Sequence, residues 1–255
     1  MKGVILAGGK GTRLYPLTYA TNKHLLPVYD KPMIYYPIET LVKAGITEIL
    51  IVTGESHAGD FMNVLKNGKE VGLTHLEYAY QEGGSAGISD ALKYAESFAD
   101  GDPIAVILGD NTTDADISQA VREFDDGAMV FLKQVPDPSR FGIPRFSSSN
   151  PSIIEEILEK PVDPPSDMAV TGLYFYDGTV FDKIRSLTPS ARGELEVTDL
   201  NNTYIQEGKL KWTKLEGFWS DAGTFPSLFR SNYYWAQKKL GSSLSTVIDG
   251  KENNP

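Results

Sequence analysis

The sequence contains no cysteine and only three histidines, and no apolar run in it approaches the length of a membrane-spanning helix. Without cysteine there is no disulfide bond and no thiolate metal site, which fits a cytoplasmic protein. A membrane span needs about 20 consecutive apolar residues, and the opening residues do not resemble a secretory signal peptide. We therefore expect a cytoplasmic protein that has no membrane as a partner.

Positive charge is scarce as well. The chain has 24 Lys and Arg residues against 34 Asp and Glu residues, which gives a formal net charge of −10. Nucleic-acid binding requires a basic surface along the phosphate backbone, so nucleic acid is not an expected partner. Cations that bind phosphate must be local features of this acidic chain. Its 255 residues suffice to bury a full core as one large domain or as two modest ones.

The hydrophobic pattern predicts an α/β fold. Apolar runs indicate buried strands, and apolar stripes at helical spacing indicate helices between them. Strands that alternate with helices form a doubly wound, mostly parallel sheet. Beyond residue 133 many prolines separate short segments, which favours an inserted subdomain of antiparallel strands and loops. The expected strands are 2–7, 48–52, 75–80, 104–108, 128–132, 170–176 (the clearest of the insertion) and 209–215, and the expected helices are 33–44, 56–65, 88–98, 180–186, 197–207 and a closing helix to about 239.

A glycine-rich turn follows the first predicted strand. Gly8, Gly9 and Gly11 have no Cβ atoms, so backbone N–H groups there can approach phosphate oxygens closely. Arg13 and Lys23 bring a planar fork and a point charge to the same place. Open α/β sheets bind nucleotides at this position, after the first parallel strand. The turn therefore predicts a polyphosphate site, with a plain structural turn as the alternative.

Two familiar glycine motifs do not fit this turn. A P-loop has Ser or Thr directly after Gly-Lys, and here Gly11 stands between Lys10 and Thr12. The dinucleotide fingerprint would place its third glycine at position 14, which is Leu14. The turn thus matches neither of these two motifs.

Asp110 and Asp221 are candidate metal ligands. Asp110 directly follows the strand at 104–108, on the same sheet edge as the glycine turn, and Asp221 follows an aromatic-rich segment. In a chain without cysteine, carboxylates at strand ends suit a hard, oxygen-ligated cation such as Mg²⁺. Turn aspartates that accept local backbone N–H groups are an equally good reading of the composition alone.

Longer strings make the glycine turn more specific. The string GGKGTRL at 8–14, followed by KHLLP at 23–27, resembles the sugar-1-phosphate nucleotidylyltransferases, and DKPMIYYP at 30–37 looks most like the glucose-1-phosphate thymidylyltransferases among them. The resemblance covers roughly residues 1–240 and implies a Rossmann-like nucleotidyltransferase fold. It implies one domain over 1–240, with a nucleotide-binding part (1–133), a mainly sugar-binding part (134–215), a second metal segment and closing helix (216–240), and then a polar tail that frays (241–255).

The reaction implied by this resemblance is a direct displacement. The phosphate oxygen of glucose 1-phosphate attacks the α-phosphorus of dTTP, which yields dTDP-glucose and pyrophosphate. A phosphate monoester is already anionic, so the enzyme mainly positions and neutralises charge. Arg13 would hold the β- and γ-phosphates, and Lys23 would neutralise the α-phosphate and the attacking phosphate. Asp110 and Asp221 match the family's two Mg²⁺-binding segments.

The resemblance also assigns the substrate contacts. Gln81 and Gly87 fall where the family reads the pyrimidine edge, and Glu159-Lys160 falls where it binds sugar hydroxyls and the sugar phosphate. A surface position for Lys23, a strand-end salt bridge for Glu159 and a packing role for His24 are the structural alternatives. The expected nucleotide contacts are Leu6, Gly8, Gly9, Gly11, Thr12, Arg13, Gln81 and Gly87, and the expected sugar-phosphate contacts are Gly142, Glu159, Lys160, Val170, Tyr174, Arg192 and Glu194.

Some features depart from the family pattern or leave choices open. The base-reading turn at 81–87 lacks the usual proline and is one residue longer, and the chain looks like the short form, without the C-terminal helices that longer members use for assembly and allosteric inhibition. UTP or another hexose 1-phosphate is an alternative substrate. A non-catalytic sugar-nucleotide-binding module is another alternative, against which the intact cations and carboxylates argue. The oligomeric state, a homo-oligomer included, stays open.

Overall fold

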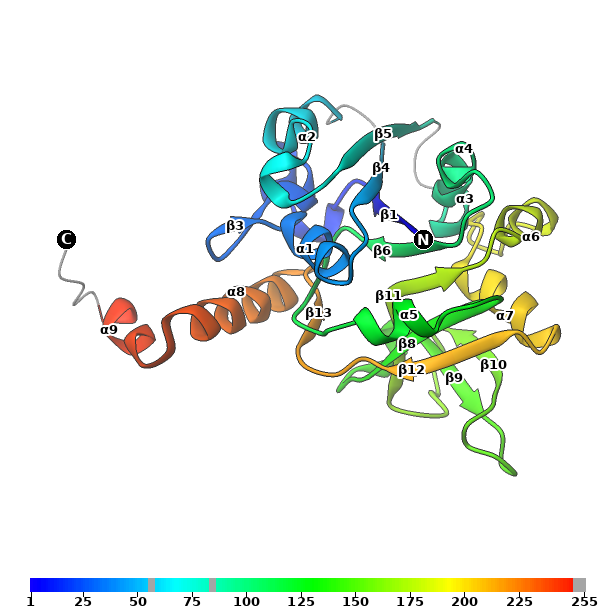
Figure 1. Cartoon of the computed structure of the whole chain (residues 1–255). Coiled ribbons are helices and arrows are strands. Elements are labelled where there is room, and N and C mark those ends of the chain that lie inside the picture. Colours follow the sequence, from blue (N-terminus) through cyan, green and yellow to red (C-terminus); the bar gives the residue numbers. More distant parts are fainter. Residues whose placement is uncertain (55–57, 83–85, 250–255) are drawn as a thin grey trace.

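The computed structural model describes residues 1–54, 58–82 and 86–249. At its centre lies a seven-stranded sheet with the order β12-β8-β11-β6-β1-β4-β5 (Figure 1). β11 is antiparallel to both of its neighbours, and the other strands of this sheet run parallel to one another. The strands of this sheet are β1 (Lys2–Ala7), β4 (Glu48–Gly54), β5 (His75–Gln81), β6 (Ile104–Leu108), β8 (Ala128–Gln134), β11 (Met168–Tyr176) and β12 (Leu210–Lys214).

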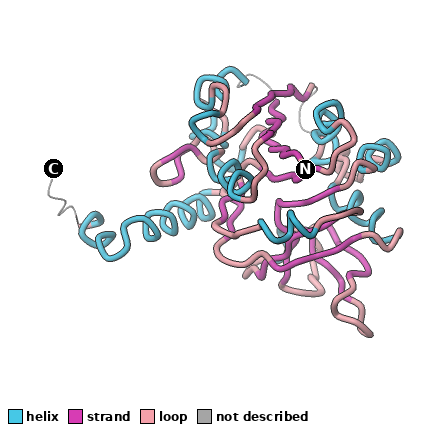
Figure 2. Tube along the Cα trace, in the orientation of Figure 1, coloured by secondary structure: helices cyan, strands magenta, loops and turns pink. Residues whose placement is uncertain are grey.

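Helices cover both faces of the sheet, as the alternation of helices and strands predicts (Figure 2). Side chains of β1 point alternately to two separate cores: Val4 and Leu6 pack with α3, α4, α6 and α7, and Ile5 and Ala7 pack with α1, α2 and α5. The sheet is therefore buried on both sides, and the doubly wound prediction is confirmed. The helices are α1 (Tyr35–Lys43), α2 (Ala58–Leu65), α3 (Ile88–Leu92), α4 (Glu96–Ala99), α5 (Ser118–Glu123), α6 (Val180–Ser186), α7 (Val197–Gln206), α8 (Phe225–Leu240) and α9 (Leu244–Ile248).

Among the described residues, three pairs of short strands lie outside the central sheet. They are β2 (Pro27–Val28) with β3 (Lys31–Pro32), β7 (Asn111–Thr113) with β13 (Trp219–Asp221), and β9 (Gly142–Phe146) with β10 (Ile154–Glu159), all antiparallel. Within residues 134–215, all of which the structure describes, β9 and β10 are the strands that form a sheet of their own. β11 and β12 belong to the central sheet instead, so our placement of the 170–176 strand in an insertion was wrong.

Two expected helices differ in detail. The pattern at 88–98 folds as α3, a 3₁₀ turn over 93–95, and α4, so the helix is broken rather than continuous. The expected helix at 56–65 is present as α2 from Ala58, while its expected start at Ser56 lies outside the described residues. No helix in the described part of the chain is both long enough and apolar enough to be a candidate membrane span.

The C-terminal helix begins with a sequence-encoded cap. The Thr224 hydroxyl accepts the backbone N–H of Ser227, and the Ser227 hydroxyl accepts the backbone N–H of Thr224, which satisfies donors that a helix start leaves unpaired. α8 then leaves the body of the molecule, as Figure 1 shows. We expected the chain to fray from Gly241, but it continues as a 3₁₀ turn over 241–243 and as α9, so that prediction was wrong for the described residues.

Candidate active site

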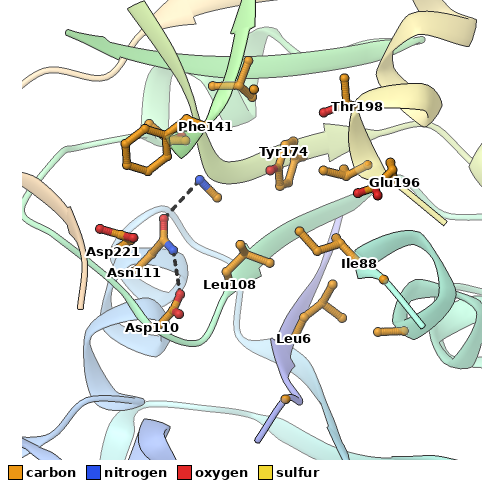
Figure 3. A pocket seen from close by; sticks show the side chains of 18 of the residues that line it. Leu6, Ile88, Leu108, Asp110, Asn111, Phe141, Tyr174, Glu196, Thr198 and Asp221 are labelled. Carbon is orange, nitrogen blue, oxygen red and sulfur yellow. Dashed lines mark hydrogen bonds between the residues drawn. The ribbon is translucent and has the colours of Figure 1, made fainter. Parts of the chain in front are cut away.

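A cavity of about 390 Å³ lies at the edge of the sheet where β1, β5 and β6 end. Its size falls in the usual range of small-molecule sites. Figure 3 shows Asp110, Asn111 and Asp221 together on one side and Thr198 and Glu196 on the other. The expected site residues that line it are Leu6, Gly8, Gly9, Arg13, Lys23, Gln81, Gly87, Asp110, Gly142, Glu159, Lys160, Val170, Tyr174, Glu194 and Asp221. Gly11, Thr12 and Arg192, which are also described, lie outside this lining.

Gly11 and Thr12 shape the glycine turn instead of lining the cavity. Gly11 has a φ of 62°, a left-handed conformation that favours glycine, and it precedes the 3₁₀ turn over Thr12–Leu14. A Cβ on Gly11 would lie 3.1 Å from the Cβ of Lys23, so the absence of a side chain lets the Lys23 segment approach. The turn therefore brings Arg13 and Lys23 to the same end of the cavity.

Lys23 and Asp110 form a mostly buried ion pair. Their Nζ and Oδ2 atoms are 2.6 Å apart, and the two side chains are 15% and 10% exposed. Burial alone would raise the pKa of Asp110, but Lys23, together with His24 and the hydrogen bond from Asn111, holds this pKa well below its usual range. Burial, reinforced by Lys23, lowers the pKa of His24 to about 3, so this ring in the cavity wall is neutral at pH 7. Lys23 is thus not a surface lysine.

Asp221 reaches Asp110 through pairing of distant strands. In the β7–β13 ladder Asp221 lies opposite Asn111, and the backbone N–H of Ala222 donates to the carbonyl oxygen of Asp110 at 2.8 Å. Burial and the nearby Asp110 carboxylate raise the pKa of Asp221, against the lowering effect of Arg140. The guanidinium of Arg140 donates to the Asp221 carboxylate at 2.8 Å.

Asn111 connects three walls of the cavity. Its Oδ1 accepts the backbone N–H of Gly172 on β11 at 3.1 Å and the indole N–H of Trp219 on β13 at 2.7 Å. Its Nδ2 donates to Oδ1 of Asp110 at 3.1 Å (Figure 3). The side chain is fully buried, and these partners leave one orientation for its amide. Asn111 therefore fixes the direction of the Asp110 carboxylate.

Gly172→Ala should lower kcat/KM by about 10- to 100-fold, because small misplacements of catalytic groups cost about that much. A Cβ on Gly172 would lie 2.7 Å from Nδ2 and 2.8 Å from Oδ1 of Asn111, so the amide must move and release Asp110. Gly59→Ala is the control, since a Cβ there meets nothing within 4 Å. Steady-state kinetics and thermal unfolding of both variants provide the measurement, and unchanged kinetics for Gly172→Ala would contradict the role of Asn111.

The other end of the cavity is built around Glu159. Its Oε2 accepts the Thr198 hydroxyl at 2.6 Å, and its Oε1 lies 2.9 Å from Nζ of Lys160. Burial would raise the pKa of Glu159, but Thr198 and Lys160 outweigh it and hold this pKa below its usual value. The guanidinium of Arg192 contacts Glu159 at 3.1 Å and Glu196 at 2.8 Å, so it pairs with these carboxylates beside the cavity.

Sequence reasoning did not assign several residues that the structure brings to the cavity. Arg140 lies in the loop between β8 and β9, and its pairing with Asp221 has no local sequence signal. Asn111 is adjacent to Asp110 in the sequence, and that adjacency was a usable signal. Thr198 lies at the start of α7, where its hydroxyl reaches Glu159. The unassigned lining residues include His24, Asn111, Arg140, Glu196, Thr198 and Asn201.

Comparison with known proteins places this site in a family. A model of the nucleotidyl transferase family matches residues 2–238. A glucose-1-phosphate thymidylyltransferase of Actinoplanes sp. is 44% identical over 239 residues, which are 92% of this chain and 78% of that protein. One of Neisseria meningitidis is 45% identical over 235 residues, which are 89% of this chain and 80% of that protein.

Solved structures agree with the sequence relatives. A crystal structure assigned as a glucose-1-phosphate thymidylyltransferase from Bacillus anthracis, in complex with a sucrose, has a TM-score of 0.86 and 48% identity, and the match covers 92% of this chain and 94% of that chain. A UDP-glucose pyrophosphorylase complexed with UDP-glucose has a TM-score of 0.80 at 24% identity, covering 93% and 98%, and this likeness shows the fold alone. Because the family match spans nearly the whole chain and the identities exceed 40% over most of it, this chain belongs to the nucleotidyl transferase family.

Proposed function

We propose that this chain is a glucose-1-phosphate thymidylyltransferase, which forms dTDP-glucose and pyrophosphate from dTTP and glucose 1-phosphate. The observation that carries the proposal is the composition of the cavity. Arg13, Lys23 and two carboxylates lie at one end, and Glu159 with Lys160 lies at the other. The names of the relatives, which are 44–45% identical, support the same activity.

In this proposal the two substrates contact different parts of the cavity lining. The nucleotide binds mainly over residues 1–133, which contribute the glycine turn, Gln81 and Asp110. The sugar phosphate binds mainly over residues 134–215, which contribute Gly142 and Glu159. A Cβ on Gly142 would lie 3.3 Å from both Cγ2 of Ile157 and Oγ1 of Thr198, so the glycine lets the backbone of β9 lie close to the residues around Glu159.

Asp110 and Asp221 fit a magnesium ion. They are two carboxylates close enough for the charge of Asp110 to raise the pKa of Asp221, which is an arrangement that a divalent cation relieves. Among the described residues no group of three or more acidic, His or Cys side chains forms a complete metal cage. Mg²⁺ commonly takes one or two protein carboxylates and completes its shell with water and substrate phosphates. Bound there, Mg²⁺ supplies charge neutralisation for the phosphates.

The chain's own residues position the phosphates. Lys23 donates one of its three N–H groups to Asp110, which leaves the others for phosphate oxygens. A Cβ on Gly223 would lie 3.2 Å from both Nη2 of Arg13 and Oδ2 of Asp110, so this glycine keeps the space between them open. Arg13 holds the β- and γ-phosphates there, and Lys23 holds the α-phosphate, where charge develops during attack. Glu159 accepts hydroxyl groups of the sugar, and Lys160 holds its phosphate.

Pyrophosphate release tests the proposal directly. With Mg²⁺ and glucose 1-phosphate present, dTTP should give turnover that depends on both substrates, and dTDP-glucose should accumulate with equal amounts of pyrophosphate. Parallel reactions with UTP, dCTP, ATP and GTP, each against a panel of hexose 1-phosphates, define the substrate pair. Absence of turnover with every pairing of dTTP or UTP would exclude this activity and would favour a binding module.

A further inference from the structure

The amide of Gln81 is held in one orientation. Gln81 is the last residue of β5, is 4% exposed and lines the cavity. Its Nε2 donates to Oδ2 of Asp90 at 2.9 Å. A glutamine amide carries a donor and an acceptor that exchange places when the group turns over, whereas an ionised carboxylate only accepts. The nitrogen of Gln81 must therefore face Asp90.

The oxygen of Gln81 consequently faces the nucleotide side. A Cβ on Gly8 would lie 3.1 Å from Oε1 of Gln81, which places this oxygen beside the glycine turn in the cavity wall. Nε2 keeps a second N–H group beyond the one that Asp90 accepts. The order of acceptor and donor along the amide is thus set by a residue that does not itself line the cavity.

Asp90 is held on its other side as well. Its Oδ1 accepts Nζ of Lys93, one helical turn further on, at 3.0 Å, and the Asp90 side chain is 18% exposed. With Gln81 on Oδ2 and Lys93 on Oδ1, both oxygens have partners. The carboxylate therefore cannot turn without breaking one of these contacts.

The helix that carries Asp90 is anchored to the sugar side of the site. The backbone N–H of Ser89 donates to the carbonyl oxygen of Leu195 at 3.2 Å, and the Ser89 hydroxyl donates to that of Glu196 at 3.1 Å. Ser89 is fully buried between these contacts. Because Glu196 itself lines the cavity, α3 and the Asp90 carboxylate have a fixed place relative to the bound substrates.

We propose that Asp90 is a positioning residue that fixes Gln81 as a hydrogen-bond acceptor toward the base, so that the site selects pyrimidines with a ring N–H group. Thymine and uracil carry a hydrogen on N3, which the oxygen of Gln81 accepts. Cytosine has a lone pair at that position and meets the same oxygen without a hydrogen between them. A site built to hydrogen-bond one group rejects an analogue that lacks it. This selection rests on the proposed function.

Asp90→Asn removes the fixed orientation with almost no change in shape. An asparagine presents either an oxygen or a nitrogen to Gln81, so both orientations of the glutamine amide become possible. The preference for dTTP over dCTP in kcat/KM should fall by up to about tenfold, near the upper end of what one neutral hydrogen bond contributes. The ratio of dTTP to UTP should stay unchanged, since both bases carry the same ring N–H. The KM for glucose 1-phosphate should also stay unchanged.

Asp182→Asn is the matched control. Asp182 lies in the first turn of α6, as Asp90 does in α3. Each of these aspartates pairs with a cation three residues further along the chain, Arg185 for Asp182 and Lys93 for Asp90. It does not line the cavity, so its variant should keep the wild-type nucleotide preference. Asp90→Ala, which removes the acceptor altogether, should reproduce the loss of preference, and thermal unfolding verifies that each variant is folded.

Calorimetric titration with dTTP and with dCTP separates this inference from the proposed function. If the wild type binds dTTP more tightly than dCTP and Asp90→Asn does not, the inference holds even for a chain without turnover. If dTTP turnover is normal and both Asp90 variants keep the wild-type ratio of dTTP to dCTP within twofold, the inference is wrong and the proposed function stands.

Discussion

Asp110→Asn should lower kcat/KM for dTTP by about a thousandfold while leaving the protein folded. The substitution removes a carboxylate that we propose as a metal ligand and that is also the partner of Lys23 at 2.6 Å. A loss of this size is expected where one group both places a cation and neutralises another. Asparagine has the same shape but only one acceptor oxygen, so it cannot keep both the hydrogen bond from Asn111 and the contact with Lys23. Steady-state kinetics over a range of Mg²⁺ concentrations measures the effect.

Asp177→Asn is the control for Asp110. Asp177 also lies just beyond the end of a strand of the central sheet, but this strand is the antiparallel β11, so Asp177 lies at the opposite edge from the cavity. Its carboxylate accepts the backbone N–H of Gly127 at 2.9 Å and the hydroxyl of Tyr204 at 3.1 Å. Its variant should lose about 1–2 kcal/mol of stability and keep its activity. Near-normal turnover of Asp110→Asn at limiting Mg²⁺ would show that Asp110 is not a ligand.

Lys23→Met should lower kcat by about 100- to 1000-fold and change the KM for dTTP much less. In the proposed reaction Lys23 holds the α-phosphate, where charge develops, and loss of a contact that strengthens in the transition state reduces kcat. Methionine keeps the apolar stem of a side chain that is only 15% exposed. Without Lys23, burial raises the pKa of Asp110 and its main partner no longer opposes this effect. The acid limb of the pH dependence of activity should therefore move to higher pH at subsaturating Mg²⁺.

Lys31→Met is the control for Lys23. Lys31 forms an ion pair with Glu39 at the same 2.6 Å distance, but it does not line the cavity. Its variant should keep both kcat and the pH profile. If Lys23→Met changed only the KM for glucose 1-phosphate, Lys23 would be a binding residue for the ground state and the division of roles between Arg13 and Lys23 would be wrong.

Much of the fold could be predicted because its signals are local. The apolar runs at 48–52 and 104–108 are buried strands, and the pattern at 180–186 coincides with α6. The cavity lining contains the expected Gly8, Gly9, Arg13 and Lys23. A glycine turn that follows the first strand of such a sheet lies at the carboxyl ends of the strands, where these sheets bind their ligands. The break in the helix at 88–98 was missed, because apolar spacing does not distinguish an α-helix from a 3₁₀ turn over three residues.

The strand at 170–176 shows what local pattern cannot decide. Its residues predict a buried strand, which is present, but nothing in them indicates that β11 runs against β6 and β8 in the central sheet. The order of strands in a sheet depends on which strands pair, and the paired strands are separated by long stretches of sequence. For the same reason the sequence did not indicate which strands of 134–215 form a sheet of their own. In the structure these are β9 and β10 alone.

The sequence by itself determined the family resemblance, the alternation of strands and helices, and the residue types available for phosphate and sugar. Tertiary structure alone decided how those groups act on one another. Arg140 reaches Asp221 across 81 residues, and Thr198 reaches Glu159 across 39. Asn111 contacts Trp219 across 108 residues, with an amide orientation set by donors from two other strands. Hydrophobic periodicity is a property of neighbouring residues, whereas the direction of a carboxylate or an amide depends on partners that only the folded chain brings near.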